Sequence, residues 1–209
     1  MRKLLILDCD GVLYPAANIS HSNFVTAFFK TMEYFGMKEA LIDEEKISCA
    51  AEFWNVIYKM CRNTGCEFDE FCRKMIENVD YKKIRKSQTL LSLLKATKKN
   101  FDIVVLSDNH HYHLEQVLKQ RFNLGINDFA KMGIHCYDIT STKQADVFLP
   151  KSRQEGLRNF LHRQNRKVEE CIFVDNSRLN IAAGRKIGME SVYIYKNRSL
   201  QKYLREINN

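Results

Sequence analysis

Several features that would assign this chain to a special class of protein are scarce or missing from its sequence. No apolar run approaches the ~18 residues that a membrane-spanning helix needs, and the sequence has no repeats or low-complexity tracts. The seven cysteines are scattered and form no C-x-x-C pair, which predicts reduced, mostly buried thiols and argues against a disulfide framework or a zinc site. The first apolar run is too short and too soon followed by acids for a signal peptide, so we expect a cytoplasmic protein with no membrane contact.

What is present is typical of a globular protein. Of 209 residues, 45% are hydrophobic and 28% are charged, and this length suits one core with a small inserted unit. The net charge of +8 comes almost entirely from residues 151–209, with 13 basic and 6 acidic residues. A basic segment can attract phosphorylated ligands or nucleic acid. A solvated helical surface explains it equally well, so a nucleic-acid partner is not favoured.

Short apolar segments without polar alternation predict buried strands, at residues 3–7, 103–106, 133–137, 171–174 and 191–195. Helical patterns separate them, at residues 88–99, 111–121, 153–164 and 178–187. Strands of this kind alternating with helices indicate a parallel sheet covered on both faces. The predicted fold is therefore α/β, with a three-layer Rossmann-like core.

The stretch from residue 14 to residue 86 breaks this alternation. It has amphipathic segments at residues 22–35, 43–61 and 69–78 but no strand-like run. We therefore expect a helical insertion after the first strand, so that residues 1–13 and 87–209 form the core domain and residues 14–86 form a cap domain.

Three of the apolar segments end in polar triplets: Asp8-Cys9-Asp10, Ser107-Asp108-Asn109 and Asp175-Asn176-Ser177. In a parallel sheet, ligands bind beyond the carboxyl ends of the strands. One such triplet has little weight, but three at the same edge predict a functional site.

Asp8 and Asp10 are two residues apart, so in an extended chain their side chains point to the same side. Two such carboxylates repel each other unless a cation or a shared proton intervenes. Mg²⁺ is the expected cation because it prefers oxygen ligands, often carboxylates with phosphate, and Asp175 can supply another carboxylate. One aspartate is then free to attack phosphorus while the other transfers a proton. Gly11 allows the sharp turn that follows.

The second triplet and Lys151 are suited to binding a phosphate group. The Ser107 hydroxyl can donate to a phosphoryl oxygen, and the backbone amides of Asp108 and Asn109 open the following helix, where anions bind. Lys151 offers a compact positive charge for the phosphate and for the attacking carboxylate. A lone serine or lysine is more often a capping or surface residue, so the prediction depends on the combination.

These segments resemble, in order, the four motifs of the haloacid dehalogenase (HAD) superfamily. The motifs are Asp8-Cys9-Asp10-Gly11-Val12, Ser107 after an apolar strand, Lys151, and Val174 to Ile181 followed by Ala182-Ala183 and Gly188-Met189. The resemblance spans the whole chain, with the insertion at residues 14–86 placed like the family's helical (C1-type) cap.

The resemblance implies a HAD-like hydrolase in which Asp8 is the phosphorylated nucleophile and Asp10 is the general acid/base. It implies that Asp8, the carbonyl of Asp10 and Asp175 bind Mg²⁺, and that Ser107 and Lys151 bind the phosphate. The dehalogenase branch lacks the second aspartate, so Asp10 favours phosphoryl transfer over carbon–halogen cleavage.

One position departs from the family pattern. Many relatives have two adjacent acids in the fourth motif, whereas this chain has Asp175-Asn176. The amide of Asn176 adds no charge, so we expect either weaker metal binding or a metal contact through water. Gly11 is expected to support the site beside it.

We therefore expect a Mg²⁺-dependent phosphomonoester hydrolase that acts on a small phosphorylated metabolite. Leu13-Tyr14-Pro15 resembles the sequence of pyrimidine 5′-nucleotidase-like members, which favours a nucleoside monophosphate. A sugar phosphatase or a phosphomutase is the alternative, and a catalytically weak phosphate- or nucleic-acid-binding protein is the third. Aromatic residues of the insertion could stack on a base, but at helical spacing they more often form a core.

The tract His110-His111-Tyr112-His113 raises the question of a second metal site. His110 and His113 would share a helix face. The sequence offers no cysteine or acid at ligand spacing nearby. Polar residues at the mouth of the site are therefore the expected description.

Overall fold

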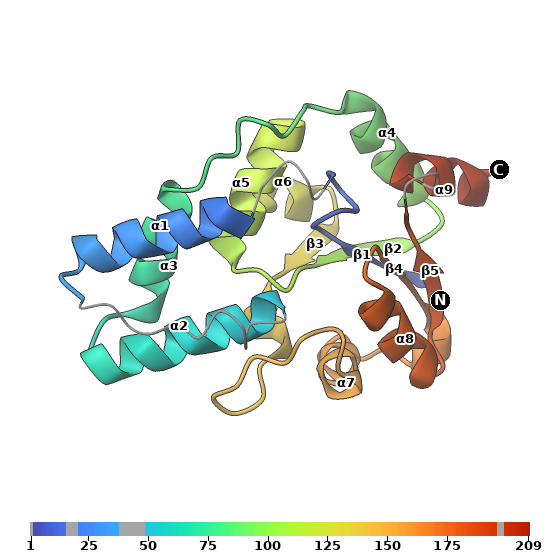
Figure 1. Ribbon diagram of the computed structural model, residues 1–209. Helices are drawn as coiled ribbons and strands as arrows, with labels where there is room; N and C mark the ends of the chain where they lie inside the picture. The colour runs from blue at the N-terminus through green and yellow to red at the C-terminus, as the bar shows by residue number, and fades with distance from the viewer. Residues whose placement is uncertain (1, 16–20, 38–48, 196–198) are drawn as a thin grey trace.

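A five-stranded parallel sheet forms the centre of the molecule, in the order β3-β2-β1-β4-β5 (Figure 1). The computed structural model describes residues 2–15, 21–37, 49–195 and 199–209. The strands are β1 (Leu4–Asp8), β2 (Asp102–Leu106), β3 (Ile134–Tyr137), β4 (Cys171–Asp175) and β5 (Glu190–Tyr193). All five strands expected from the apolar runs are present, and every pairing is parallel.

Each face of the sheet packs against its own group of helices. Leu5 and Leu7 of β1 belong to a core that includes α4 (Gln88–Thr97), α5 (His111–Phe122) and α9 (Leu200–Asn208). Leu4 and Ile6 point the other way and pack with α7 (Gln154–Arg163) and α8 (Arg178–Lys186). Because both sets of side chains are buried, the strand needs no polar alternation. The three-layer α/β fold is therefore confirmed.

Helices α1 (His21–Tyr34), α2 (Ala50–Thr64) and α3 (Phe68–Glu77) lie together beside one end of the sheet (Figure 1). The segments predicted at residues 22–35 and 69–78 match α1 and α3. The segment predicted at residues 43–61 matches α2 from residue 50, and residues 43–48 lie outside the described part. Trp54 and Phe71 of these helices belong to the same buried cluster as Leu5, so the helices share a core with the sheet.

Two expectations about composition can be compared with the structure. All seven cysteines are free thiols, and Cys9, Cys61, Cys72 and Cys171 are buried, as predicted. No helix within the described residues is long and apolar enough to cross a bilayer. The short helix α6 (Ile126–Lys131) and α9 were not predicted.

The register of the sheet brings the polar triplets to one level. Asp8, the last residue of β1, pairs with Leu106 of β2, and Leu7 pairs with Val174 of β4. Since β1 lies between β2 and β4, the three triplets emerge from adjacent strands at the same edge. This edge is where the site was predicted.

Candidate active site

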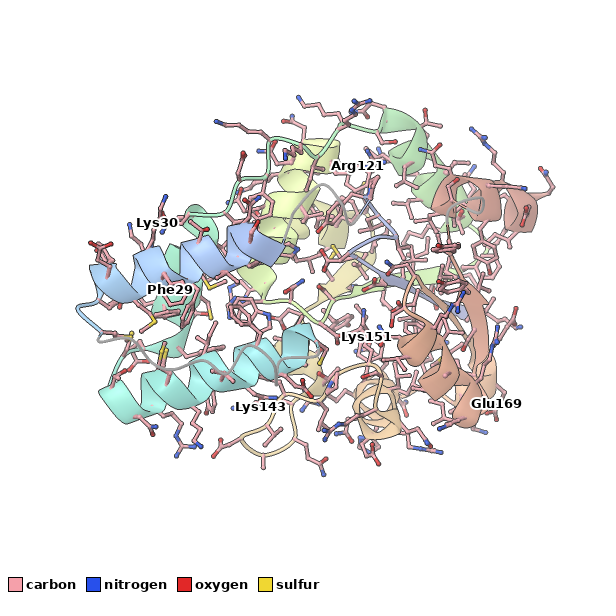
Figure 2. The ribbon with its side chains drawn as sticks, in the orientation of Figure 1. Phe29, Lys30, Arg121, Lys143, Lys151 and Glu169 are labelled. Carbon is pink, nitrogen blue, oxygen red and sulfur yellow. The ribbon has the colours of Figure 1, made fainter. Side chains whose placement is uncertain are left out.

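Asp8 and Lys151 form a buried ion pair at the end of β1. The Lys151 ammonium donates to Asp8 Oδ1 and, at 3.0 Å, to the carbonyl of Leu106, and it lies 3.5 Å from Asp175 Oδ2. Lys151 is only 1% exposed, and it points toward the centre of the molecule in Figure 2. A buried ammonium is stable only where such acceptors surround it, so these acids and Lys151 depend on one another.

The pKa values of this group follow from burial and charge. Burial raises the pKa of Asp8 well above its usual value, Asp175 raises it further, and Lys151 opposes both. Burial alone would lower the pKa of Lys151, but Asp8, Asp108 and Asp175 raise it above its ordinary value. The site therefore has more negative charge than one lysine balances, and a further cation would be favoured there.

Asp10 accepts hydrogen bonds from three side chains. The hydroxyl of Tyr14 donates to Oδ1, His113 Nε2 lies 2.9 Å from the same oxygen, and Asn109 Nδ2 donates to Oδ2 at 2.7 Å. Tyr81 Oη lies 2.9 Å from the other ring nitrogen of His113. Burial alone would raise the pKa of Asp10, but His113, Tyr14 and Asn109 lower it below its usual value. Asp10 is therefore held as a carboxylate.

The second triplet turns inward after β2. Ser107 is completely buried, and its hydroxyl oxygen accepts a hydrogen bond from the backbone N–H of Asn109 at 3.1 Å. Its hydroxyl proton has no acceptor among the described residues. Asp108 Oδ1 accepts from the Lys151 amide at 3.2 Å, so Asp108 positions the lysine segment. Ser107 is thus left with a proton that it can donate to a ligand.

Asp175 is completely buried, with both carboxylate oxygens in use. Oδ1 accepts from the Ser177 amide at 2.7 Å, and Oδ2 accepts from Asn180 Nδ2 at 3.0 Å beside Lys151. Ser177 is also the N-cap of α8, which fixes the turn after β4. Asp175 therefore lies behind the ion pair and holds it in place.

Asn176 lies directly beside the two aspartates. The end of its side-chain amide that faces them lies 2.8 Å from the carbonyl oxygen of Asp10 and 3.2 Å from Asp8 Oδ2. With nitrogen at that end, the amide donates to both oxygens. With oxygen at that end, three oxygens converge. A Cβ at Gly11, where φ is +85°, would lie 2.0 Å from the same amide, so only glycine fits.

The sequence did not reveal three of the residues around Asp10 and Asn109. Tyr14 and Tyr81 belong to the insertion, and His113 was considered only as part of a metal tract. His113 is completely buried rather than at the mouth of the site. Trp54 of α2 reaches Asn109, with Nε1 donating to Oδ1 at 3.1 Å. Trp54 is the only tryptophan of the chain, and this could have marked it in the sequence as a candidate residue of the site.

A surface pocket of about 520 Å³ opens beside Gly11 and Asn176. Its lining includes Gly11 and Asn176 from the site and Tyr14, Tyr193 and Tyr195 around it. The volume is in the range of small-molecule sites. The pocket therefore reaches the site at Gly11 and Asn176, although the acids themselves do not line it.

A family model described as haloacid dehalogenase-like hydrolase matches residues 2–188 of this chain. No curated protein sequence matches it. Solved structures that are similar include a HAD family enzyme from Bacteroides thetaiotaomicron in complex with magnesium and inorganic phosphate. It is 18% identical, with a TM-score of 0.54 over 93% of this chain and 95% of the other.

A second similar structure is that of CbbY from Rhodobacter sphaeroides in complex with phosphate. It is 12% identical, with a TM-score of 0.55 over 95% of this chain and 88% of the other. At such low identity these likenesses concern the fold alone.

Proposed function

The chain belongs to the haloacid dehalogenase-like hydrolase family, and on that premise we propose that it is a Mg²⁺-dependent phosphatase of small phosphomonoesters. The observation that carries the proposal is the buried ion pair of Asp8 and Lys151, which ends β1 beside Asp10 and Ser107. In this proposal a nucleophile, a proton carrier and two groups that donate hydrogen bonds to the phosphate lie together there.

The reaction proceeds in two steps. A carboxylate oxygen of Asp8 attacks phosphorus, the bond between phosphorus and the ester oxygen breaks, and Asp10 gives a proton to the leaving oxygen. Water then attacks the phosphorus of the aspartyl-phosphate and gives a proton to Asp10, which releases phosphate and restores Asp8. Lys151 and the Ser107 hydroxyl stabilise the charge on the phosphoryl oxygens in both steps.

The hydrogen bonds of Asp10 suit the second step directly. As a carboxylate, Asp10 is ready to accept a proton from water. The first step requires that Asp10 carries a proton, which water supplies to it in the second step of the preceding cycle, and His113 lies 2.9 Å from this carboxyl group. The two roles of Asp10 thus depend on the residues of α5 that hold it.

The donor set fits a magnesium ion. Asp8 Oδ2 and the Asp10 carbonyl oxygen lie 3.2 and 2.8 Å from the same end of the Asn176 amide, and hard oxygen donors such as these two suit Mg²⁺. We propose Asp8, the Asp10 carbonyl and Asp175 as the ligands, with Asn176 beside them. When bound, the ion would neutralise negative charge on Asp8 and on the phosphate.

Helices α1 to α3 are proposed as a C1-type cap, within a cap domain of residues 14–86. Trp54 contacts Asn109 of the site, and Asn55 exchanges two hydrogen bonds with the backbone of Phe148, near Lys151. Because Asp8, Ser107 and Lys151 are nearly covered, the substrate enters when these helices move. The cap then excludes bulk water during the reaction.

The proposed substrate is a nucleoside monophosphate or a sugar phosphate. Leu13-Tyr14-Pro15 supports the former, although Tyr14 bonds to Asp10. Phe28 and Trp54 are fully buried, whereas Phe29 and Tyr34 are exposed, so core packing accounts for part of the aromatic set. In favour of a sugar phosphate, a mutant of CbbY with the same fold was crystallised with xylulose-(1,5)bisphosphate.

The test is hydrolysis of p-nitrophenyl phosphate and a panel of nucleotides and sugar phosphates with Mg²⁺ present. We expect release of inorganic phosphate, and loss of all activity in Asp8→Asn. Glu169→Gln is the control, because Glu169 is exposed at the outer edge of the molecule (Figure 2). Activity that survives Asp8→Asn would overturn the nucleophile, and an isomerised phosphoester without free phosphate would indicate a phosphomutase.

A further inference from the structure

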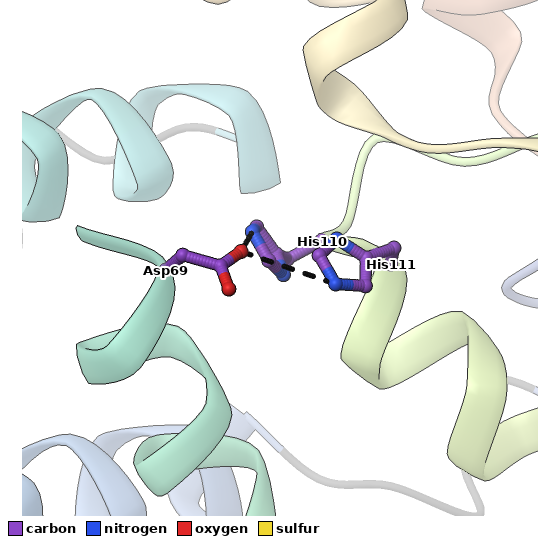
Figure 3. Close-up of side chains that lie close together, drawn as sticks. All are labelled: Asp69, His110 and His111. Atoms are coloured by element: carbon purple, nitrogen blue, oxygen red, sulfur yellow. Dashed lines mark ion pairs between the residues drawn. The ribbon is translucent and has the colours of Figure 1, made fainter. Parts of the chain in front are cut away.

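Two histidines and an aspartate gather where α3 meets α5, apart from the acids at the sheet edge (Figure 3). His110 is the N-cap of α5 and His111 is its first residue, while Asp69 comes from the first turn of α3. Asp69 Oδ1 lies 3.5 Å from His110 Nε2 and 3.9 Å from His111 Nε2. One ligand atom of each residue therefore faces the same point.

Two of the three side chains are oriented by an outer partner. His111 Nδ1 lies 3.4 Å from Asp138 Oδ2, which leaves Nε2 free. Asp138 is itself fixed by the amide and hydroxyl of Thr140. Tyr112 donates to Asp69 Oδ2 at 2.7 Å, which leaves Oδ1 free. A carboxylate behind a ligand histidine is the usual arrangement in metal sites, because it fixes the tautomer and the ring.

His110 differs from an ordinary surface histidine. Its side chain is 2% exposed and packs against Trp54 and Phe68. Burial, followed by the nearby His111, lowers the pKa of His110 to about 4, so the ring is neutral near pH 7. Its Nδ1 is buried without a hydrogen-bond partner among the described residues. Nε2, the other ring nitrogen, faces Asp69 Oδ1.

We propose that Asp69 Oδ1, His110 Nε2 and His111 Nε2 bind one divalent transition-metal ion of the Zn²⁺ type. Two imidazoles and one carboxylate suit such ions, and Mg²⁺ prefers oxygen ligands alone. With metal–ligand distances of about 2.0–2.1 Å, tetrahedral ligands are about 3.3–3.4 Å apart. Since Asp69 is 62% exposed, its side chain can make the small movement from 3.9 Å. A water completes the fourth position.

The ion would join α3 to the start of α5, directly after Asn109 of the active site. Asn109 contacts both Asp10 and Trp54. A metal that fixes α3 against His110 therefore also limits the movement of the helices that cover the catalytic acids. This inference depends on the geometry of the three ligands and stands independently of the proposed phosphatase reaction.

The test uses the full chain, stripped with a chelator and returned to buffer with millimolar Mg²⁺ so that oxygen-rich sites are occupied. Co²⁺ is the probe, because a tetrahedral site with nitrogen ligands gives a visible absorption band, and Zn²⁺ then displaces it. We expect one equivalent of Co²⁺ to bind per chain. In Asp69→Asn and His111→Ala the affinity should fall about tenfold or more.

Glu70→Gln is the matched control, since it removes one exposed acid from the same turn of α3 and should leave binding unchanged. Both altered ligands are substantially exposed, so the variants are expected to fold, as circular dichroism will check. Zn²⁺ should also raise the Tm of the wild type and the control only. Absence of saturable binding, or equal binding by Asp69→Asn, would overturn the proposal.

Discussion

At the scale of single residues, the pairing of Gly11 with Asn176 decides how the site is charged. Asn176 stands where many relatives have a second acid. Its neutral amide touches both Asp8 and the Asp10 carbonyl. The amide can occupy this place only because Gly11 has no side chain. In the absence of metal, an amide nitrogen relieves the repulsion that a third carboxylate would cause. The same neutrality weakens attraction for Mg²⁺.

We predict that Asn176→Asp binds Mg²⁺ about tenfold more tightly, which corresponds to about 1.4 kcal/mol. The added carboxylate attracts the cation, but without the metal it faces Asp8, so the metal-free variant should have a lower Tm. Calorimetric titration and thermal unfolding with and without Mg²⁺ measure both effects. Asn127→Asp, an exposed change on α6, should alter neither. Unchanged Mg²⁺ affinity in Asn176→Asp would show that this side chain is not near the ion.

At the scale of elements, α5 is the helix that controls Asp10. The segment that leads into it supplies Asn109 to Oδ2, and its first turn supplies His113 to Oδ1. Tyr81, before α4, fixes the far side of the His113 ring. Because the ring is buried and held at both nitrogens, it keeps a constant position against the carboxylate. The charged form of Asp10 is therefore favoured by its hydrogen-bond partners, among them His113 of α5.

We predict that His113→Phe moves the basic limb of the pH dependence of kcat/KM to higher pH. His113 favours the charged form of Asp10, so its removal raises the pKa of Asp10, and the acid form that the first step needs persists to higher pH. Tyr81→Phe is the matched control, because it keeps the contact of His113 with Asp10 and should shift the limb less. An unmoved basic limb in a folded His113→Phe variant would contradict this assignment.

At the scale of the whole molecule, one buried cluster joins helices α1 to α3 to the sheet. Trp54 and Phe71 pack in the same cluster as Leu5 and Leu7 of β1. The helical group therefore does not have a separate core among the described residues. Its hydrophobic contacts and those of the sheet stabilise each other.

This shared packing also explains what the sequence could and could not predict. The strands and the Asp8 and Asp175 strand ends were predictable, because apolar runs and polar triplets are local patterns. The contacts of Trp54 with Asn109 and of Asp69 with His110 were not, since they join segments far apart in the chain. The sequence has no acid at ligand spacing near the histidine tract, but the fold brings Asp69 of α3 next to His110 and His111.

We predict a single cooperative unfolding transition in urea. Unfolding of α2 exposes apolar side chains of the buried cluster that these helices share with the sheet, so neither part should remain folded alone. Trp54, the only tryptophan, is fully buried in α2, so its fluorescence follows the cap helices. Far-UV circular dichroism follows all helices. The two curves should have the same midpoint and slope.

The comparison should be made without metal and again with Mg²⁺ and phosphate, because ligands that bind only the folded chain shift both curves together. The midpoints should rise equally for the two probes. A fluorescence change at lower urea than the loss of helix would show that α1 to α3 unfold separately. In that case the shared cluster would contribute little to stability, and the cap could open without loosening the sheet.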